Sequence, residues 1–176
     1  FEQALARPGG RLGGEVDGAD DLMALAAERS PDPIPDATEG ADMLYSSGTT
    51  GRPKGVLRAL SGEPLGTTAG LALLGEFLMG MSPESVYLSP APMYHAAPLK
   101  WSLESLALGA SVVLMERFEP EALLSAIETH GVTHGQFVPT MFVRMLKLPE
   151  EVRNRYDVSS LQAIIHAAAP CPEDVK

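Results

Sequence analysis

From residue 41 onward, short apolar runs alternate with longer amphipathic stretches, and this alternation constrains the fold more than any other feature of the sequence. Short apolar runs bounded by turn residues are typical of strands, and the stretches between them have helical spacing. Strands that alternate with helices form a mainly parallel sheet covered by helices. We therefore expect an α/β fold with about five mainly parallel strands, near residues 42–46, 85–89, 111–115, 133–137 and 162–166.

The clearest of the expected helices covers residues 120–130. Pro120 suits a first helical turn, Glu119 and Glu121 favour the positive end of the helix, and Gly131 follows its last turn. Apolar residues at helical spacing predict the other helices, at residues 66–79, 99–108 and 139–148 and from residue 172.

The first forty residues differ from the rest in composition. They hold nine acidic and three basic residues, and the Pro-rich stretch at 31–36 cannot form a helix. One short helical pattern lies at 20–29. We expect residues 1–40 to be a connecting segment with one short helix, and residues 41–176 to be a partial α/β subdomain.

The overall charge narrows the classes of partner. The chain has 13 Lys and Arg against 23 Asp and Glu, a net charge of −10, which argues against nucleic acid or an anionic lipid surface as the main partner. A membrane-spanning helix needs about 20 mostly apolar residues, and the sequence has no such run. A single cysteine, Cys171, excludes an internal disulfide and fits a cytoplasmic location. The chain begins without Met and without the pattern of a signal peptide, so we expect it to be a piece of a longer protein.

Residues 45–55, Tyr-Ser-Ser-Gly-Thr-Thr-Gly-Arg-Pro-Lys-Gly, carry the strongest chemical signal. Glycines let successive N–H groups converge on an anion, hydroxyls add donors for phosphate or for the ligand shell of Mg²⁺, and Lys54 supplies a positive charge. The spacing does not fit the Walker or the dinucleotide-binding pattern. The segment predicts a phosphate-binding loop, and the alternative is a flexible turn without a ligand.

Residues 46–55 resemble the signature loop of the adenylate-forming superfamily, which includes acyl-CoA synthetases, peptide-synthetase adenylation domains and beetle luciferases. Residues 92–95, Pro-Met-Tyr-His, resemble the motif of that family that lines the acyl pocket. Residues 164–170, Ile-Ile-His-Ala-Ala-Ala-Pro, resemble the strand end that packs against adenine and ribose, with alanines where glycines are usual. The residues of these three motifs look most like those of bacterial fatty-acyl-CoA synthetases. The resemblance implies that the chain is one Rossmann-like half of a large N-terminal domain.

The resemblance also implies roles for individual residues. Lys54 and His95 become candidate catalytic residues, and Thr49 and Thr50 become candidates for contact with Mg²⁺. Without the resemblance, His95 could be a packing residue and His166 a capping or core residue. The full set of candidate nucleotide-binding residues is Ser46, Ser47, Gly48, Thr49, Thr50, Gly51, Lys54, His166, Ala167, Ala168, Ala169 and Pro170.

The function that this resemblance implies is an ATP-dependent acid–thiol ligase. Such an enzyme activates a carboxylic acid, here expected to be a fatty acid, as acyl-AMP and transfers the acyl group to CoA. Its cofactors and co-substrates would be ATP, Mg²⁺ and CoA. The alternatives are an adenylation domain for an amino or aryl acid, and a non-catalytic module that binds nucleotides or anions. The sequence stops before the later catalytic motifs of the family, so we expect the chain alone to be inactive.

Overall fold

The structure is a computed structural model that describes residues 24, 27–32, 34–46, 54–67, 70–166 and 169–175. The chain forms two compact units, residues 1–67 and residues 68–176, and each has its own sheet. The division falls later than the boundary at 40/41 that composition predicts, and the roles assigned to the segments on either side of 40/41 stay predictions.

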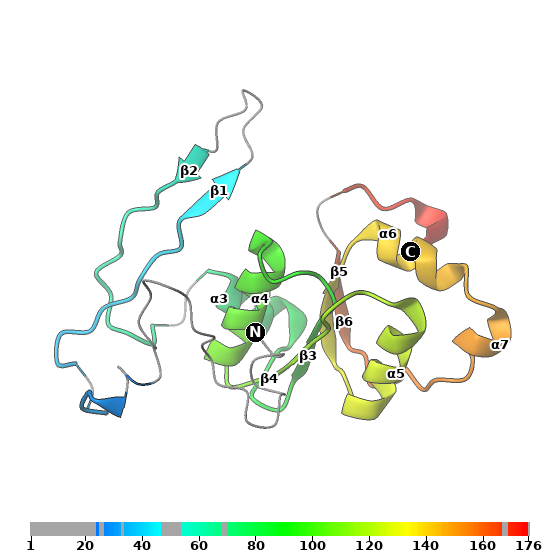
Figure 1. Ribbon diagram of the computed structural model, residues 1–176, viewed down its shortest axis with the longest axis horizontal. Coiled ribbons are helices and arrows are strands. Elements are labelled where there is room, and N and C mark those ends of the chain that lie inside the picture. The colour runs from blue at the N-terminus through cyan, green and yellow to red at the C-terminus, as the bar shows by residue number, and fades with distance from the viewer. Residues whose placement is uncertain are drawn as a thin grey trace. The chain divides into compact units, whose positions relative to one another are not determined.

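The second unit contains a four-stranded parallel sheet (Figure 1). Its strand order is β4-β3-β5-β6, and every adjacent pair is parallel. The fold is therefore α/β with a parallel sheet, as the alternating pattern predicts. The bounds of the strands are β3 Val86–Ser89, β4 Ser111–Leu114, β5 His134–Phe137 and β6 Ala163–His166.

Helices cover both faces of this sheet (Figure 1). The expected helix at 120–130 is confirmed to the residue, and Gly131 ends it with φ of 59°, in the left-handed region that glycine adopts without a steric penalty. The helix expected from residue 99 begins earlier, at Ala96, because Pro98 is tolerated in a first helical turn. The bounds are α3 Leu71–Met79, α4 Ala96–Ala107, α5 Pro120–His130, α6 Pro139–Leu146, α7 Glu150–Arg153 and the short 3₁₀ helix η1 Glu173–Val175.

The strand expected near 42–46 does not join the parallel sheet. Strand β1, Leu44–Ser46, pairs antiparallel with β2, Lys54–Val56, in a separate two-stranded sheet of the first unit. A parallel crossover needs a connection of about a dozen residues or more, so the seven residues between β1 and β2 allow these two strands to pair only as a hairpin. The expectation of a fifth parallel strand was therefore wrong. The helix expected at 20–29 lies largely outside the described residues.

Two apolar clusters hold the parallel sheet between its helices. Alternate residues of a strand face opposite sides, so Leu88 and Phe137 pack toward α5 and α6, while Tyr87 packs toward α3 and α4. Leu123 of α5 and Trp101 of α4 are among the residues that complete these two clusters. Because all four strands are parallel, their carboxyl ends lie at one edge of the sheet, and the two clusters hold the sheet in place.

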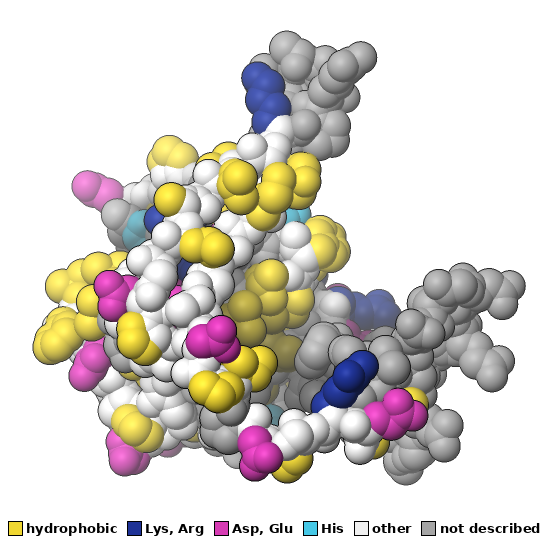
Figure 2. All heavy atoms as spheres, turned by 90° about the vertical axis from the view of Figure 1, so that its left-hand side faces the viewer, with side chains coloured by type: hydrophobic (Ala, Val, Ile, Leu, Met, Phe, Trp, Pro, Cys, Tyr) yellow, Lys and Arg dark blue, Asp and Glu magenta, His cyan; other side chains and the backbone are white. Residues whose placement is uncertain are grey.

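Hydrophobic side chains also reach the surface of the described residues (Figure 2). On α3, Phe77 is 80% exposed and Leu78 is 73% exposed, while Ala72 of the same helix is buried. On α4, Leu103 and Leu106 are exposed as well. The apolar residues of these helices therefore divide between an inner stripe that contacts the sheet and outer positions at the surface.

Gly135 is required by the packing of β5. A Cβ atom at this position would lie 2.9 Å from two atoms of the Phe137 ring and 3.3 Å from the carbonyl oxygen of Leu88. Phe137 is buried and makes an edge contact with Phe142 at 5.8 Å between centroids, so its ring has little room to move. We expect Gly135→Ala to lower the free energy of unfolding by about 1–3 kcal/mol through overpacking.

Urea unfolding followed by the fluorescence of Trp101, the single tryptophan, measures this effect. Gly40→Ala is the matched control, because a Cβ there meets nothing within 4 Å. Adding Phe137→Leu to Gly135→Ala should restore part of the loss by removing the clashing ring. Equal stability of Gly135→Ala and the unmodified protein would contradict this account of the strand.

Candidate functional site

The carboxyl edge of the parallel sheet is where this fold can bind a ligand. From β3 the chain runs to β4 on one side, whereas β5 and β6 lie on the other, so the strand order reverses between β3 and β5. Open α/β sheets bind ligands at the carboxyl ends of the strands beside such a reversal. The segment after β3, residues 90–95, leads from this point into α4.

The turn at residues 92–95 is anchored on one side and exposed on the other. The backbone N–H of His95 donates to the carbonyl of Pro92 at 3.1 Å, which closes the turn. The sulfur of Met93 accepts hydrogen bonds from the hydroxyls of Ser89 at 3.9 Å and Ser102 at 3.7 Å. Met93 thus ties the turn to both β3 and α4.

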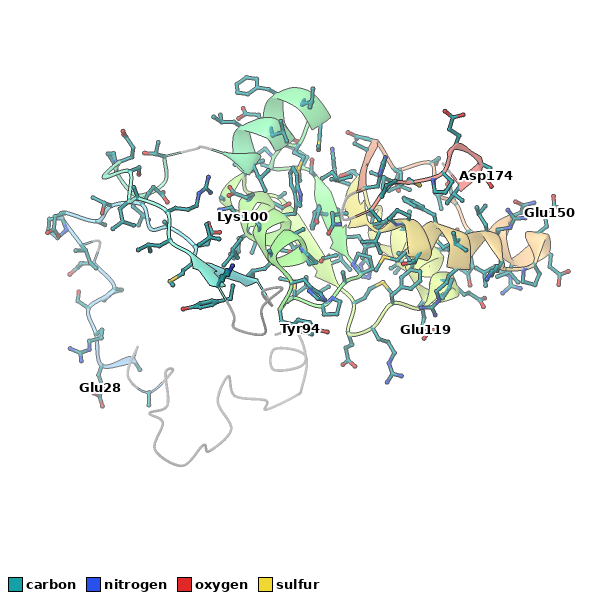
Figure 3. The ribbon with its side chains drawn as sticks, turned by 90° about the horizontal axis from the view of Figure 1, so that it is seen from above. Glu28, Tyr94, Lys100, Glu119, Glu150 and Asp174 are labelled. Atoms are coloured by element: carbon teal, nitrogen blue, oxygen red, sulfur yellow. The ribbon has the colours of Figure 1, made fainter. Side chains whose placement is uncertain are left out.

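Tyr94, which Figure 3 labels, and His95 are both exposed in this turn, as is Pro92. His95 immediately precedes α4, and its carbonyl accepts the N–H of Leu99 at 3.2 Å. The ring of His95 lies against the ring of Tyr94, with 4.5 Å between centroids. A buried packing role, the alternative that the sequence left open for His95, does not fit this exposure.

His166 lies at the same edge, at the end of β6. It pairs in register with Phe137 of β5, and its side chain is exposed, which excludes a core role. Ala169 and Pro170 are exposed too. Ala167 and Ala168, expected to pack against adenine and ribose, lie outside the described residues.

The candidate phosphate loop belongs to the first unit. Ser46 and Lys54 are register partners in the β1–β2 hairpin, so the pairing of the strands holds the two ends of the loop together, and Lys54 is exposed. The residues between them lie outside the described part of the chain, and they include Ser47, Gly48, Thr49, Thr50 and Gly51.

Gly55, next to Lys54, leaves room over the hairpin for the side chains of Tyr45 in β1 and of Met43 just before it. A Cβ at Gly55 would lie 3.2 Å from the ring of Tyr45 and 2.6 Å from the terminal carbon of Met43. By sequence, the donor set of the loop consists of hydroxyls, backbone N–H groups, the guanidinium group of Arg52 and the ammonium group of Lys54. That set fits a polyphosphate, and hydroxyl oxygens fit the ligand shell of Mg²⁺.

The structure therefore groups the candidate residues within each unit. Ser46 is brought next to Lys54 in the first unit, and His95 and His166 share the carboxyl edge in the second. In the described part of the chain, no group of three or more His, Cys, Asp and Glu side chains is arranged to hold a metal ion.

His134 is a structural residue. It is fully buried at the start of β5, and its Nε2 donates to the carbonyl of Met79 at 2.9 Å. The hydroxyl of Thr133 lies 2.8 Å from its Nδ1 and accepts the N–H of Val86 at 2.9 Å. This network ties the last turn of α3 to β3 and β5, at the opposite edge from the candidate site.

Two other buried polar groups were not predicted from the sequence. The hydroxyl of Tyr87 and the Oε1 atom of Gln136 have no hydrogen-bond partner among the described residues, and burial raises the pKa of Tyr87. Both lie on the face of the sheet toward α3 and α4. No periodicity or motif could have revealed them, because their burial depends on how distant helices pack.

The sheet order and the helices on both faces define an α/β protein of the open-sheet class, in which the strand reversal is the usual place for a ligand. Residues 6–176 match the sequence model of the family described as AMP-binding enzyme, and the chain belongs to that family. Among the described helices, none has the length and apolar character that crossing a membrane requires.

Relatives from plants and bacteria show similar coverage. The chain is 36% identical over 146 residues to 4-coumarate–CoA ligase 5 of Oryza sativa subsp. japonica, covering 80% of this chain and 26% of that protein. It is 32% identical over 137 residues to 2-succinylbenzoate–CoA ligase of Bacillus pumilus, covering 78% of this chain and 26% of that protein. The chain thus spans about a quarter of the length of the curated relatives it matches.

Solved structures share the fold. The N-terminal domain of FACL13 from Mycobacterium tuberculosis matches with a TM-score of 0.67 and 27% identity, covering 89% of this chain and 38% of that one. The o-succinylbenzoate coenzyme A synthetase of Bacillus subtilis, solved in complex with ATP and magnesium ion, matches with a TM-score of 0.59 and 30% identity, covering 80% of this chain and 27% of that one.

Proposed function

We propose that this chain is part of an ATP-dependent ligase that joins a carboxylic acid to CoA. A carboxylate oxygen attacks the α-phosphorus of ATP, pyrophosphate leaves, and acyl-AMP forms. The sulfur of CoA then attacks the acyl carbon, and AMP leaves with the electrons of the broken bond. The observation that carries this proposal is the family match over residues 6–176, which includes the loop held between Ser46 and Lys54.

The residues of the loop would hold the phosphates of ATP. Its N–H groups and hydroxyls donate to phosphate oxygens, and Lys54 stabilises the charge that develops on departing pyrophosphate, which is positional and electrostatic work. Thr49 and Thr50 would hold Mg²⁺, which supplies further charge neutralisation. His95 would face the carboxylate of the acid, and His166 with residues 167–170 would lie against the nucleoside.

Two classes of acid have specific support. The residues of the three motifs look most like those of fatty-acyl-CoA synthetases, which favours a fatty acid. The relatives named for 4-coumarate and 2-succinylbenzoate favour an aryl acid. A cytoplasmic location is also part of the proposal, supported by the single cysteine.

The full-length enzyme is the material for the test. With ATP, Mg²⁺ and hydroxylamine, we expect it to form acyl hydroxamate with at least one acid from a panel of fatty, hydroxycinnamic and other aryl acids. The preferred acid decides between the two classes. ATP binding without hydroxamate from any acid would support the non-catalytic nucleotide-binding module instead.

The 176-residue chain by itself is the comparison in the same assay. It spans about a quarter of the length of its curated relatives, and catalytic groups that act as a unit are strongly non-additive. We therefore expect no acyl hydroxamate or acyl-CoA from the chain alone. Product formed at a rate near that of the full-length enzyme would show that the remaining residues are dispensable.

A further inference from the structure

The contact between Tyr94 and His95 is not explained by the packing of the fold. The two rings lie 4.5 Å apart at 49°, within the range in which aromatic rings attract one another. Tyr94 is 82% exposed, so the contact contributes almost nothing to the core. The contact therefore belongs to the exposed turn after β3 and not to the packed sheet.

The backbone around His95 is held on both sides. The hydrogen bond to Pro92 closes the turn before it, the bond from Leu99 begins the helix after it, and the half-buried Met93 ties the turn to Ser89 and Ser102. The side chain of His95, by contrast, has no hydrogen bond in the described part of the chain. Backbone hydrogen bonds hold the position of its Cα, and the ring of Tyr94 is the group that the structure places against the imidazole.

The position of Tyr94 and His95 in the fold suggests a function for their contact. Both residues follow β3 at the reversal of strand order, where an open α/β sheet binds its ligand. We propose that Tyr94 is a positioning residue, whose ring holds the imidazole of His95 in one orientation toward the carboxylate of the acid. The inference rests on the proposed function and adds a residue to the same site.

The proposal assigns the effect to the ring of Tyr94 and not to its hydroxyl. Removing the ring frees the imidazole, so Tyr94→Ala should lower kcat/KM for the acid roughly two- to tenfold, the range expected for one aromatic contact. Tyr94→Phe keeps the ring and should stay within about twofold of the unmodified enzyme. In a His95→Ala background, Tyr94→Ala should cause no further loss, because its effect passes through His95.

A spectroscopic measurement tests the contact without any turnover. In the full-length enzyme labelled with ¹³C-histidine, the ring C–H resonance of His95 is identified by its absence from His95→Ala. The neighbouring ring current should displace it, so the resonance should move in Tyr94→Ala and return to its position in Tyr94→Phe. Phe77→Ala is the matched control. Phe77 is an exposed aromatic residue on α3, away from the turn of Tyr94, so its removal should change neither the resonance nor kcat/KM.

Three results would overturn the positioning role: a resonance that does not move in Tyr94→Ala, a Tyr94→Phe variant as impaired as Tyr94→Ala, or losses that add fully in the double variant. Failure of the proposed function looks different. In that case the unmodified enzyme makes no product from any acid of the panel, whatever the resonance of His95 does.

Discussion

Replacing Lys54 by Ala in the full-length enzyme should slow adenylate formation by about 100- to 1,000-fold, the loss typical of removing one preorganised group that stabilises transition-state charge. Lys54 is exposed at one end of the candidate phosphate loop, opposite Ser46 in the hairpin. Its ammonium group can therefore reach a phosphate without breaking an interaction of the fold. Binding of the acid should change much less, because the proposed partner of Lys54 is the phosphate chain.

The rate of pyrophosphate exchange measures adenylate formation, and an equilibrium titration with the acid measures its binding. Lys147→Ala is the matched control, because Lys147 is an exposed lysine at the end of α6. Removing the hydroxyls of Thr49 and Thr50 together should also impair exchange more than acid binding. Unchanged exchange in both the Lys54 and the threonine variants would show that the loop is an ordinary turn.

Phe137→Ala should lower the free energy of unfolding by about 3–5 kcal/mol, the range for removing a buried aromatic side chain. Phe137 is 1% exposed at the end of β5, and it belongs to the cluster that joins the sheet to α5 and α6. Its edge contact with Phe142 of α6 is lost with the ring. The neighbouring side chains are held by the sheet and the helices, so they fill the cavity only in part.

Urea unfolding followed by Trp101 fluorescence gives the size of this effect. Phe77→Ala removes the same side chain from an exposed position and should change stability by less than about 0.5 kcal/mol. A loss below about 1 kcal/mol for Phe137→Ala would contradict this account, because it would mean that the neighbouring side chains fill the space of the ring.

The sequence predicted which segments form the candidate site, but it did not predict the contacts within them. The loop at 46–55 and the segment 92–95 were found because a motif is a local pattern of residue types. The same motif could not show that Met93 is anchored between Ser89 and Ser102, or that Tyr94 contacts His95. Those contacts depend on where β3 and α4 lie in space, and the side-chain types alone do not specify it.

His134 shows the same limit for a residue without a motif. In the sequence it is a lone histidine at the start of a predicted strand. In the structure it is buried and bonded to Thr133 beside it and to Met79, 55 positions away. Its structural role follows from the packing of α3 on the sheet, which no local signal encodes.

The sequence by itself determined the α/β class and the bounds of α5. Alternating apolar and amphipathic segments specify strands and helices, and the signals at Pro120 and Gly131 act within a turn or two of the residue that carries them. Only the tertiary structure decided that the strand order is β4-β3-β5-β6 and that Leu44–Ser46 pairs with Lys54–Val56 outside the parallel sheet. The physical reason is that a strand leaves its N–H and C=O groups unpaired, and which distant strand satisfies them depends on connection length and on the packing of the whole chain.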